Sequence, residues 1–398
     1  MKPTAVLDIG SSKVVCLCGS ISERDGIIVH GAGVSSCNAY REDELTDKQG
    51  LHDAIVEVIR KAEQEASVRF RDVTLTVPVS FSKLLLSDIT MSFGDKARTV
   101  ETEDVDRLIA KSSHRVGNPD GYVLMHSTPV FFLVDGISSP ESPVGIQTEE
   151  ISGLIAHMFV KREFVQTLQD IMEDIGIEFS ACVSAILGEA TMLIPESERI
   201  RPAVLIDVGY RQTDLCVIEG SAVTAQASIP IGGYQFSSDL AFALDVTQES
   251  AEQAKRRFVF SLDYGDKTEI LRSETESKRV ANSTIAYVIE ARAAELADLI
   301  RQELERMSVN LDAKPSIYLS GGGLLMMRGS LEFLKKQLGA AIKRDMPWTP
   351  RLSSPNYCSA FGALNFVLRA NRAAEEQPQK AERDEESFLN KLKNFFTK

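Results

Sequence analysis

The chain has 398 residues, of which 43% are hydrophobic and 25% charged, a composition typical of a soluble globular protein with more than one domain. Its net charge of -13 argues against a nucleic-acid-binding surface, because phosphate contacts require basic patches. The five histidines lack ligand spacing and the six cysteines form no C-x-x-C pair, which argues against a histidine metal site and indicates reduced core cysteines in a cytosolic protein.

Two parts of the chain have the same succession of predicted strands. In each part, apolar runs separated by short polar turns predict a three-stranded meander. The strands are expected at Ala5–Ile9, Val14–Gly19 and Gly26–Val34, and again at Ala203–Val208, Thr213–Glu219 and Ala222–Pro230. Apolar residues at helical spacing follow each meander, from Leu51 to Ala62 and from Ile285 to Leu304. This repetition predicts a duplicated α/β protein with two similar lobes.

The segment Ser82–Val160 has a different pattern from the two meanders. A helix is expected to begin near Thr102, and strands are expected at Tyr122–Val134 and Ile151–Val160. A further helical stripe follows from Phe164 to Ile175. We interpret Ser82–Val160 as an inserted subdomain.

Each meander contains an Asp-x-Gly turn, in DIGSSKVVC (Asp8–Cys16) and in DVGYRQTDL (Asp207–Leu215). Glycine lets the backbone bend sharply and lets a phosphate approach main-chain N–H groups, while hydroxyl and lysine side chains add donors. The aspartate supplies an oxygen that can hold Mg²⁺ through its water shell. One such turn alone is best explained as ordinary turn chemistry. Two of them in a duplicated meander favour a clamp for one polyphosphate.

A third stretch, IYLSGGGLLMMRG (Ile317–Gly329), places three glycines between a predicted strand and a predicted helix. A flexible loop is the simpler interpretation of these glycines. Three consecutive glycines at such a junction are nevertheless costly unless another group approaches the backbone closely. A flat base and its ribose lying against the backbone would be such a group.

In this order, the two turns and the strand–glycine–helix stretch resemble the phosphate-1, phosphate-2 and adenosine motifs of the actin-like ATPase superfamily. Within it, the chain is most similar to the FtsA family of bacterial cell division proteins. The segments that carry this similarity are Val123–Gly136 with Pro143–Gly145, IPIGGYQFSSDLAFAL (Ile229–Leu244), AEQAKRR (Ala251–Arg257) and VIEARAAEL (Val288–Leu296). The resemblance covers nearly the whole chain. It implies an actin-like α/β fold of duplicated ribonuclease-H-like lobes, with an inserted α+β subdomain and a C-terminal amphipathic helix.

The resemblance also implies domain boundaries. The first lobe is expected at 1–81, 162–199 and 346–370, with the inserted subdomain at 82–161. The second lobe is expected at 200–234 and 284–345, with its own inserted part at 235–283. A flexible linker is expected at 371–386, because this stretch is polar and contains proline, and a membrane-targeting helix at 387–398.

Carried over position by position, the resemblance implies a site for ATP and Mg²⁺. Asp8 and Asp207 become the carboxylates on the metal side. Glu252 and Lys255, three positions apart on one helix face, match residues that hold the ribose and base. The phosphate loops, the glycine pair and the adenosine glycines fall on Gly10, Ser11, Ser12, Lys13, Gly209, Gln212, Thr213, Gly232, Gly233, Gly321, Gly322 and Gly323.

The second turn departs from the family pattern Asp-x-Gly-Gly-Gly-Thr-x-Asp. Tyr210, Arg211 and Gln212 occupy the Gly-Gly-Thr positions. Side chains at these positions would crowd the γ-phosphate, although an arginine is also able to pair with phosphate oxygens. We therefore expect ATP binding with slow or absent hydrolysis, at most a slow ATPase.

The last residues, SFLNKLKNFFTK, combine apolar and basic side chains. If they form a helix, one face carries the apolar residues beside lysines: Phe388, Leu389, Leu392, Phe395 and Phe396, with Lys391 and Lys393. A basic amphipathic helix after a polar linker predicts an anchor at an anionic membrane surface. The alternative is a helix docked on its own domain, which the long linker disfavours.

Three functions are compatible with these patterns. The resemblance favours an ATP-binding filament former that tethers the FtsZ division ring to the cytoplasmic face of the cell membrane and recruits later divisome proteins. Its expected partners are the FtsZ C-terminal peptide, further copies of the chain and anionic lipid, with Arg256 and Arg257 as candidate peptide contacts. A small-molecule kinase and a pilus-assembly adaptor of the same superfamily are the alternatives. Fold alone does not decide among these three functions. The basic amphipathic tail disfavours both alternatives.

Overall fold

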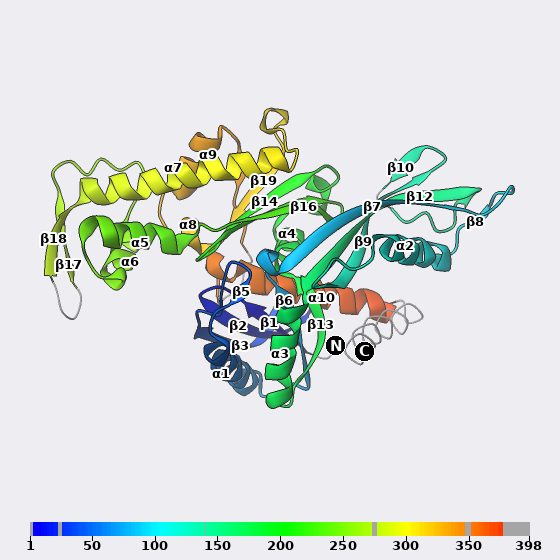
Figure 1. The fold of residues 1–398 in the computed structure, drawn as a ribbon, viewed down its shortest axis with the longest axis horizontal. Coiled ribbons are helices and arrows are strands. Elements are labelled where there is room, and N and C mark those ends of the chain that lie inside the picture. The colour runs from blue at the N-terminus through cyan, green and yellow to red at the C-terminus, as the bar shows by residue number, and fades with distance from the viewer. Residues whose placement is uncertain (1–2, 23–25, 140, 273–276, 347–351, 377–398) are drawn as a thin grey trace. The chain divides into compact units, whose positions relative to one another are not determined.

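The computed structural model describes residues 3–22, 26–139, 141–272, 277–346 and 352–376. These residues form two compact units, whose elements are labelled in Figure 1. Unit 1 contains the described residues up to Arg201, the hairpin segment Ile218–Thr224 with the adjoining strand ends, and the helical residues from Ser359 onward. Unit 2 contains Pro202–Val217 and the described part of Ala225–Cys358.

The main sheet of unit 1 has the strand order β13-β6-β1-β2-β3. β2 pairs antiparallel with both β1 and β3, so the first predicted meander is confirmed. β6 pairs parallel with β1 and with β13. The strands are β1 (Thr4–Ile9), β2 (Lys13–Ile21), β3 (Ile27–Ser36), β6 (Asp72–Val77) and β13 (Glu178–Ser184), and a small pair joins β4 (Tyr40–Arg41) to β5 (Glu44–Leu45).

Helix α1 (Lys48–Ala66) packs against β2 and β3 of this sheet. Asp47 caps its N-terminus by accepting a hydrogen bond from the amide of Gly50. The predicted apolar stripe of α1 is buried, from Leu51 to Ala62, which fixes the face that meets the sheet. The other helices of this part are α3 (Arg162–Asp174), α4 (Ala185–Leu193) and α10 (Cys358–Glu376), with single turns η1 (Val79–Phe81) and η2 (Glu196–Glu198).

Between Ser82 and Lys161 the chain forms a separate sheet of order β10-β9-β12-β7. β12 pairs antiparallel with β7 and β9. One face of this sheet packs on α2, where Leu108 lies among Phe132, Ile151 and Ile155. The elements are β7 (Ser82–Ser92), α2 (Thr102–Val116), β9 (Tyr122–Val134), β10 (Ile137–Ser139) and β12 (Glu150–Lys161), with a small pair of β8 (Arg98–Thr99) and β11 (Gln147–Thr148).

Unit 2 repeats the topology of the main sheet of unit 1. Its order β16-β15-β14-β19-β20 matches β3-β2-β1-β6-β13 strand for strand. In unit 2, β19 pairs parallel with β14 and β20, as β6 pairs parallel with β1 and β13 in unit 1. The strands are β14 (Ala203–Val208), β15 (Thr213–Glu219), β16 (Ala222–Ile229), β19 (Ser316–Ser320) and β20 (Ile342–Lys343). The predicted duplication is therefore visible in the strand order.

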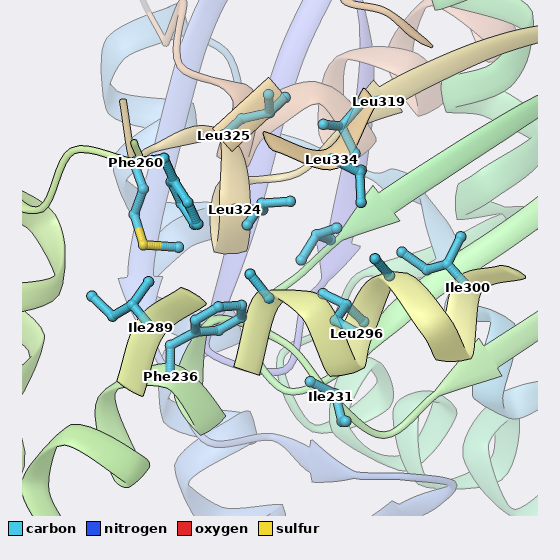
Figure 2. Close-up of a cluster of buried hydrophobic side chains, with 14 of the residues drawn as sticks. Ile231, Phe236, Phe260, Ile289, Leu296, Ile300, Leu319, Leu324, Leu325 and Leu334 are labelled. Atoms are coloured by element: carbon cyan, nitrogen blue, oxygen red, sulfur yellow. The ribbon is translucent and has the colours of Figure 1, made fainter. Parts of the chain in front are cut away.

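One apolar cluster joins the helices of unit 2 to its sheet (Figure 2). Phe236 of α5 and Leu296 of α7 belong to the same cluster as Leu319 of β19, Leu324 of α8 and Leu334 of α9. The elements are α5 (Gly233–Leu244), α6 (Gln248–Arg257), the hairpin β17 (Thr268–Arg272) and β18 (Ser277–Ala281), α7 (Asn282–Arg306), η3 (Leu311–Ala313), α8 (Gly322–Leu325), α9 (Ser330–Leu338) and η4 (Pro355–Tyr357).

Two boundaries differ from those expected. Unit 1 resumes at Ser359 instead of residue 346, because Asn356 in η4 packs against Gly322 of α8 and keeps the preceding segment in unit 2. Helix α10 extends to Glu376, so residues 371–376 are helical and not linker; most of them are good helix formers. The remainder of the expected linker and the expected helix at 387–398 lie outside the described residues.

Candidate functional site

The two Asp-x-Gly turns have the same closed geometry. In unit 1 the amide of Gly10 donates to the carbonyl oxygen of Lys13 at 3.0 Å, and in unit 2 the amide of Gly209 donates to that of Gln212 at 2.9 Å. A Cβ atom would lie 2.9 Å from the acceptor oxygen at Gly10 and 3.0 Å at Gly209. Both positions therefore favour glycine for the same steric reason.

Asp8, at the end of β1, is buried beside two hydroxyl groups of unit 1. Thr76 on β6 donates to its Oδ1 at 2.8 Å, and Ser359 at the start of α10 donates at 2.9 Å. The Thr76 hydroxyl also accepts from the amide of Ile9 at 3.1 Å. Burial raises the pKa of Asp8 above its ordinary value, and these hydrogen bonds and the charge of Lys13 oppose the shift. The sequence did not indicate Thr76 or Ser359, since neither is near Asp8 in the chain.

In unit 2, the triple glycine lies against the second turn. Gly321 has a positive φ of 86°, and a Cβ atom there would overlap Asp207 and the carbonyl of Val208. A Cβ atom at Gly323 would overlap the carbonyl oxygen of Gly209. At Gly322 it would lie 2.6 Å from Cβ of Asn356. Groups of the protein itself therefore approach the three glycines closely, and this close approach explains why glycine is needed at each position.

Helix α5 begins directly on the same turn. The amide of Gly233 donates to the carbonyl of Gly209 at 2.9 Å, and the amide of Tyr234 donates to that of Tyr210 at 2.7 Å. A Cβ atom at Gly232 would lie 2.6 Å from the carbonyl oxygen of Tyr210. The glycine pair thus lets the helix N-terminus bind turn carbonyls that a larger residue would displace.

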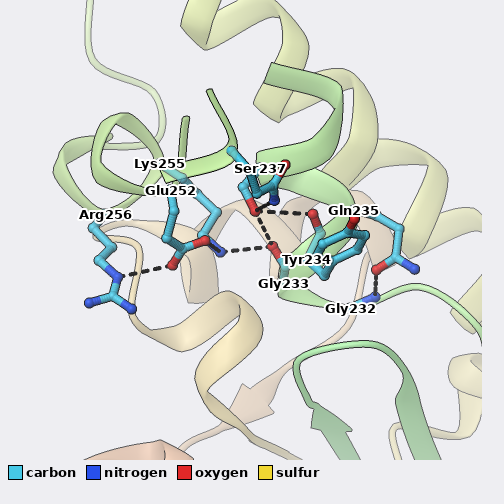
Figure 3. Close-up of polar contacts among 9 residues, drawn as sticks. Gly232, Gly233, Tyr234, Gln235, Ser237, Glu252, Lys255 and Arg256 are labelled. Carbon is cyan, nitrogen blue, oxygen red and sulfur yellow. Dashed lines mark hydrogen bonds and ion pairs between the residues drawn. The ribbon is translucent and has the colours of Figure 1, made fainter. Parts of the chain in front are cut away.

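The buried Lys255 and the partly buried Glu252 of α6 form an ion pair near the start of α5 (Figure 3). Lys255 Nζ lies 2.6 Å from Glu252 and donates to the carbonyl of Gly233 at 2.7 Å. Arg256 binds the other oxygen of Glu252 at 2.9 Å. Burial alone would raise the pKa of Glu252, but Lys255 and Arg256 hold it below its usual range. Burial also lowers the pKa of Lys255, against the attraction of Glu252.

The two unexpected side chains of the second turn fold against α5. The rings of Tyr210 and Tyr234 meet edge to face, with centroids 5.6 Å apart. The guanidinium of Arg211 lies 4.5 Å from the ring centroid of Tyr234. Tyr234, which no sequence motif singled out, therefore provides the surface on which both residues rest.

The other two side chains assigned to this turn are bonded within unit 2. The hydroxyl of Thr213 donates to the carbonyl of Ile231 at 2.7 Å and is fully buried. The side-chain amide of Gln212 donates to the carboxylate of Asp214, which occupies the last Asp position of the family pattern Asp-x-Gly-Gly-Gly-Thr-x-Asp. A direct phosphate contact by either side chain remains a prediction.

Comparison with known proteins completes the description. A family model for the cell division protein FtsA matches residues 204–362. The FtsA of Neisseria meningitidis serogroup B is 24% identical over 375 residues, covering 92% of this chain and 90% of the relative. That of Pseudomonas aeruginosa is 22% identical, covering 91% and 88%. The chain is similar to FtsA over most of its length.

Solved structures similar to this chain share its fold. A PilM-PilN type IV pilus biogenesis complex aligns with a TM-score of 0.64 at 18% identity, covering 92% of this chain and 98% of that chain. MreB 5 of Spiroplasma citri bound to AMPPNP aligns with a TM-score of 0.55 at 13% identity, covering 94% and 99%. At such identities the likeness shows the fold alone. The chain is therefore FtsA-like in sequence and has an actin-like α/β fold.

Two features are absent from the ranges that the structure describes. No helix there has both the length and the apolar stretch that crossing a bilayer requires. No group of three or more His, Cys, Asp or Glu side chains there is placed to hold a metal ion. Mg²⁺ in nucleotide sites is bound mainly by phosphates, waters and one or two carboxylates, so the single carboxylates Asp8 and Asp207 stay candidates.

Proposed function

We propose that the chain binds ATP with Mg²⁺ and acts as an FtsA-like tether of the FtsZ ring to the cytoplasmic face of the membrane. The observation that carries the nucleotide proposal is the matched turn in each unit, closed at Gly10 and at Gly209 by the same hydrogen bond. The similarity to FtsA supports it. So do the solved structures of MreB5, which are described as bound to AMPPNP and to ADP.

The donor chemistry of the residues fits a nucleotide phosphate with a divalent cation. Asp8 offers a carboxylate that accepts hydrogen bonds from the hydroxyl groups of Thr76 and Ser359, and Lys13 adds positive charge close to it. Ser11 is buried in the same turn. Bound Mg²⁺ would neutralise phosphate charge. The chain itself would fix the turn backbones, hold the carboxylate in place and supply lysine charge to the phosphates.

Calorimetry with Mg-ATP tests this proposal. Lys13→Ala removes a positive charge at the first turn, and we expect a loss of affinity of about tenfold or more. Lys96→Ala, an exposed position in the inserted subdomain, is the matched control and should bind as the parent does. A parent protein that binds no ATP would contradict the nucleotide proposal.

The tethering part of the proposal rests on the sequence of residues 387–398 and on the similarity to FtsA. Self-assembly would place many copies of this short segment side by side, so that weak membrane contacts add by avidity. A similar solved structure is described as a MamK double helical filament, with a TM-score of 0.51 at 12% identity. Under this proposal the protein would sit at the division site and recruit later divisome proteins.

We place the FtsZ peptide contact at Arg256 and Arg257 of α6. Arg256 pairs with Glu252 and Arg257 pairs with Glu269 at 2.9 Å, so an acidic peptide would have to compete with these carboxylates. Both side chains are exposed. Reversing both charges to Glu should reduce capture of an FtsZ C-terminal peptide, whereas Arg306→Glu on α7 should not. Unchanged capture by the double variant would remove these two residues from the contact.

The pilus-adaptor alternative is kept because of the likeness to the PilM-PilN structure. At 18% identity this likeness concerns the fold. An adaptor of that kind would bind a peptide of a membrane protein and would not need its own lipid-binding segment. Binding of the purified chain to protein-free anionic vesicles therefore separates the two functions.

A further inference from the structure

The side chain of Gln212 is bonded to Asp214 on the adjacent strand. Its Nε2 donates to Oδ1 at 3.0 Å and to Oδ2 at 2.9 Å, and the residue is only 6% exposed. Ser228 on β16 donates to Oδ1 of the same carboxylate at 2.6 Å. Asp214 therefore accepts hydrogen bonds from both the turn and the neighbouring strand.

This arrangement connects the strands to the shape of the second turn. Gln212 and Asp214 are two positions apart, so their side chains share one face of the extended chain. The carbonyl oxygen of Gln212 is also the acceptor that closes the turn with Gly209. Because one residue provides both the closing carbonyl and the bonded amide group, a shift of its side chain would alter the closed turn.

We propose that Asp214 is a positioning residue for the second phosphate turn. Together with Ser228 it holds Gln212 in the conformation that closes the turn, and Gln212 acts through its backbone carbonyl instead of binding phosphate through its amide. This inference rests on the proposed ATP binding and assigns Gln212 a different role from that implied by the family pattern.

A double-mutant cycle measured by calorimetry with Mg-ATP tests the coupling between the two residues. Asp214→Ala and Gln212→Ala should each weaken ATP binding about tenfold, the effect of losing a hydrogen bond to a charged group. The double variant should bind ATP no more weakly than either single variant, because both changes remove the same hydrogen bonds between Gln212 and Asp214. Asp214→Asn keeps one carbonyl oxygen, which at the Oδ1 position accepts from both Ser228 and Gln212, so it should restore part of the affinity. Asp312→Ala, exposed elsewhere in unit 2, is the matched control.

The outcomes separate this inference from the proposed function. If the parent binds ATP and the Asp214→Ala variant binds it with an affinity within twofold of the parent, the positioning role is overturned and the proposed ATP binding stands. Additive losses in the double variant would overturn it too, because they would mean that Gln212 contacts the nucleotide independently. A parent that binds no ATP would overturn both proposals. Thermal unfolding of each variant checks folding, and if Asp214→Ala unfolds, Ser228→Ala takes its place in the cycle.

Discussion

The amide of Gly233 donates a hydrogen bond to the carbonyl oxygen of Gly209 at 2.9 Å, which joins the first turn of α5 to the second Asp-x-Gly turn. Gly323 of α8 packs against the same carbonyl oxygen. Three glycines from distant parts of the sequence therefore meet through their backbones. Any side chain at Gly323 would separate the strand–helix junction from the turn.

Gly323→Ala should destabilise unit 2, because its methyl group would overlap the carbonyl of Gly209. Overpacking of this kind typically costs about 1–3 kcal/mol of unfolding free energy. Urea unfolding of the variant measures the loss, with Gly26→Ala as the control because a Cβ atom there would make only an ordinary contact, 3.4 Å from Ser22 Oγ. Equal stability of the Gly323 variant and the parent would show that this junction is more open than described.

Replacement of Gly322 by a bulky residue would not test nucleotide contact alone. The new side chain would collide with Asn356 before any base is bound. We therefore expect such a variant to lose unfolding free energy together with ATP affinity. A loss of affinity with unchanged stability would instead favour direct exclusion of the base.

ATP hydrolysis by the parent should be slow, because Tyr210 and Arg211 occupy glycine positions of the pattern and positioning dominates phosphoryl transfer. Changing both to Gly removes the side chains that rest on Tyr234 and should partly restore turnover in a phosphate-release assay. Tyr234→Leu is the matched variant, since it removes the supporting ring and leaves the turn sequence intact. Brisk turnover by the parent would refute the argument.

The strands and helices were predictable because their apolar periodicity is local, and β14 and β15 begin and end at the predicted residues. The partners of the glycines were not predictable, since Gly209, Gly233 and Gly323 meet only in three dimensions. The role of Asp214 had one sequence signal, its place in the quoted pattern. Its bond to Gln212 depends on a side-chain rotamer, which the pattern does not contain.

Asp214 should make the stability of the protein depend on pH. Burial raises its pKa to about 6, against hydrogen bonds from Ser228 and Gln212. A raised pKa contributes stability that is complete below the unfolded value of 3.8 and is lost as the pH rises through about 6. Relative to Asp214→Asn, the parent should therefore lose up to about 3 kcal/mol between pH 4 and pH 7. Urea unfolding of both proteins at the two pH values measures this, and a constant difference would contradict the burial of the carboxylate.

The tail is tested by Phe395→Glu combined with Phe396→Glu. This variant removes apolar area worth about 25 cal/mol per Å² and adds repulsion from anionic lipid. We expect it to bind Mg-ATP as the parent does but to fail to sediment with anionic vesicles. Serine substitutions at Asn390 and Asn394, on the polar side of the expected helix, provide the control. Equal sedimentation of the double glutamate variant and the parent would mean that this segment is not the anchor.

Recruitment of purified FtsZ to anionic vesicles tests the tethering function most directly. Vesicles, FtsZ and the parent protein with Mg-ATP are sedimented together, and the FtsZ in the pellet is compared with samples that lack the parent protein or contain the Phe395→Glu, Phe396→Glu variant. The proposed function predicts that FtsZ pellets with the vesicles only when the parent protein is present. The same amount of FtsZ in the pellet with the parent, with the variant and without either would contradict it.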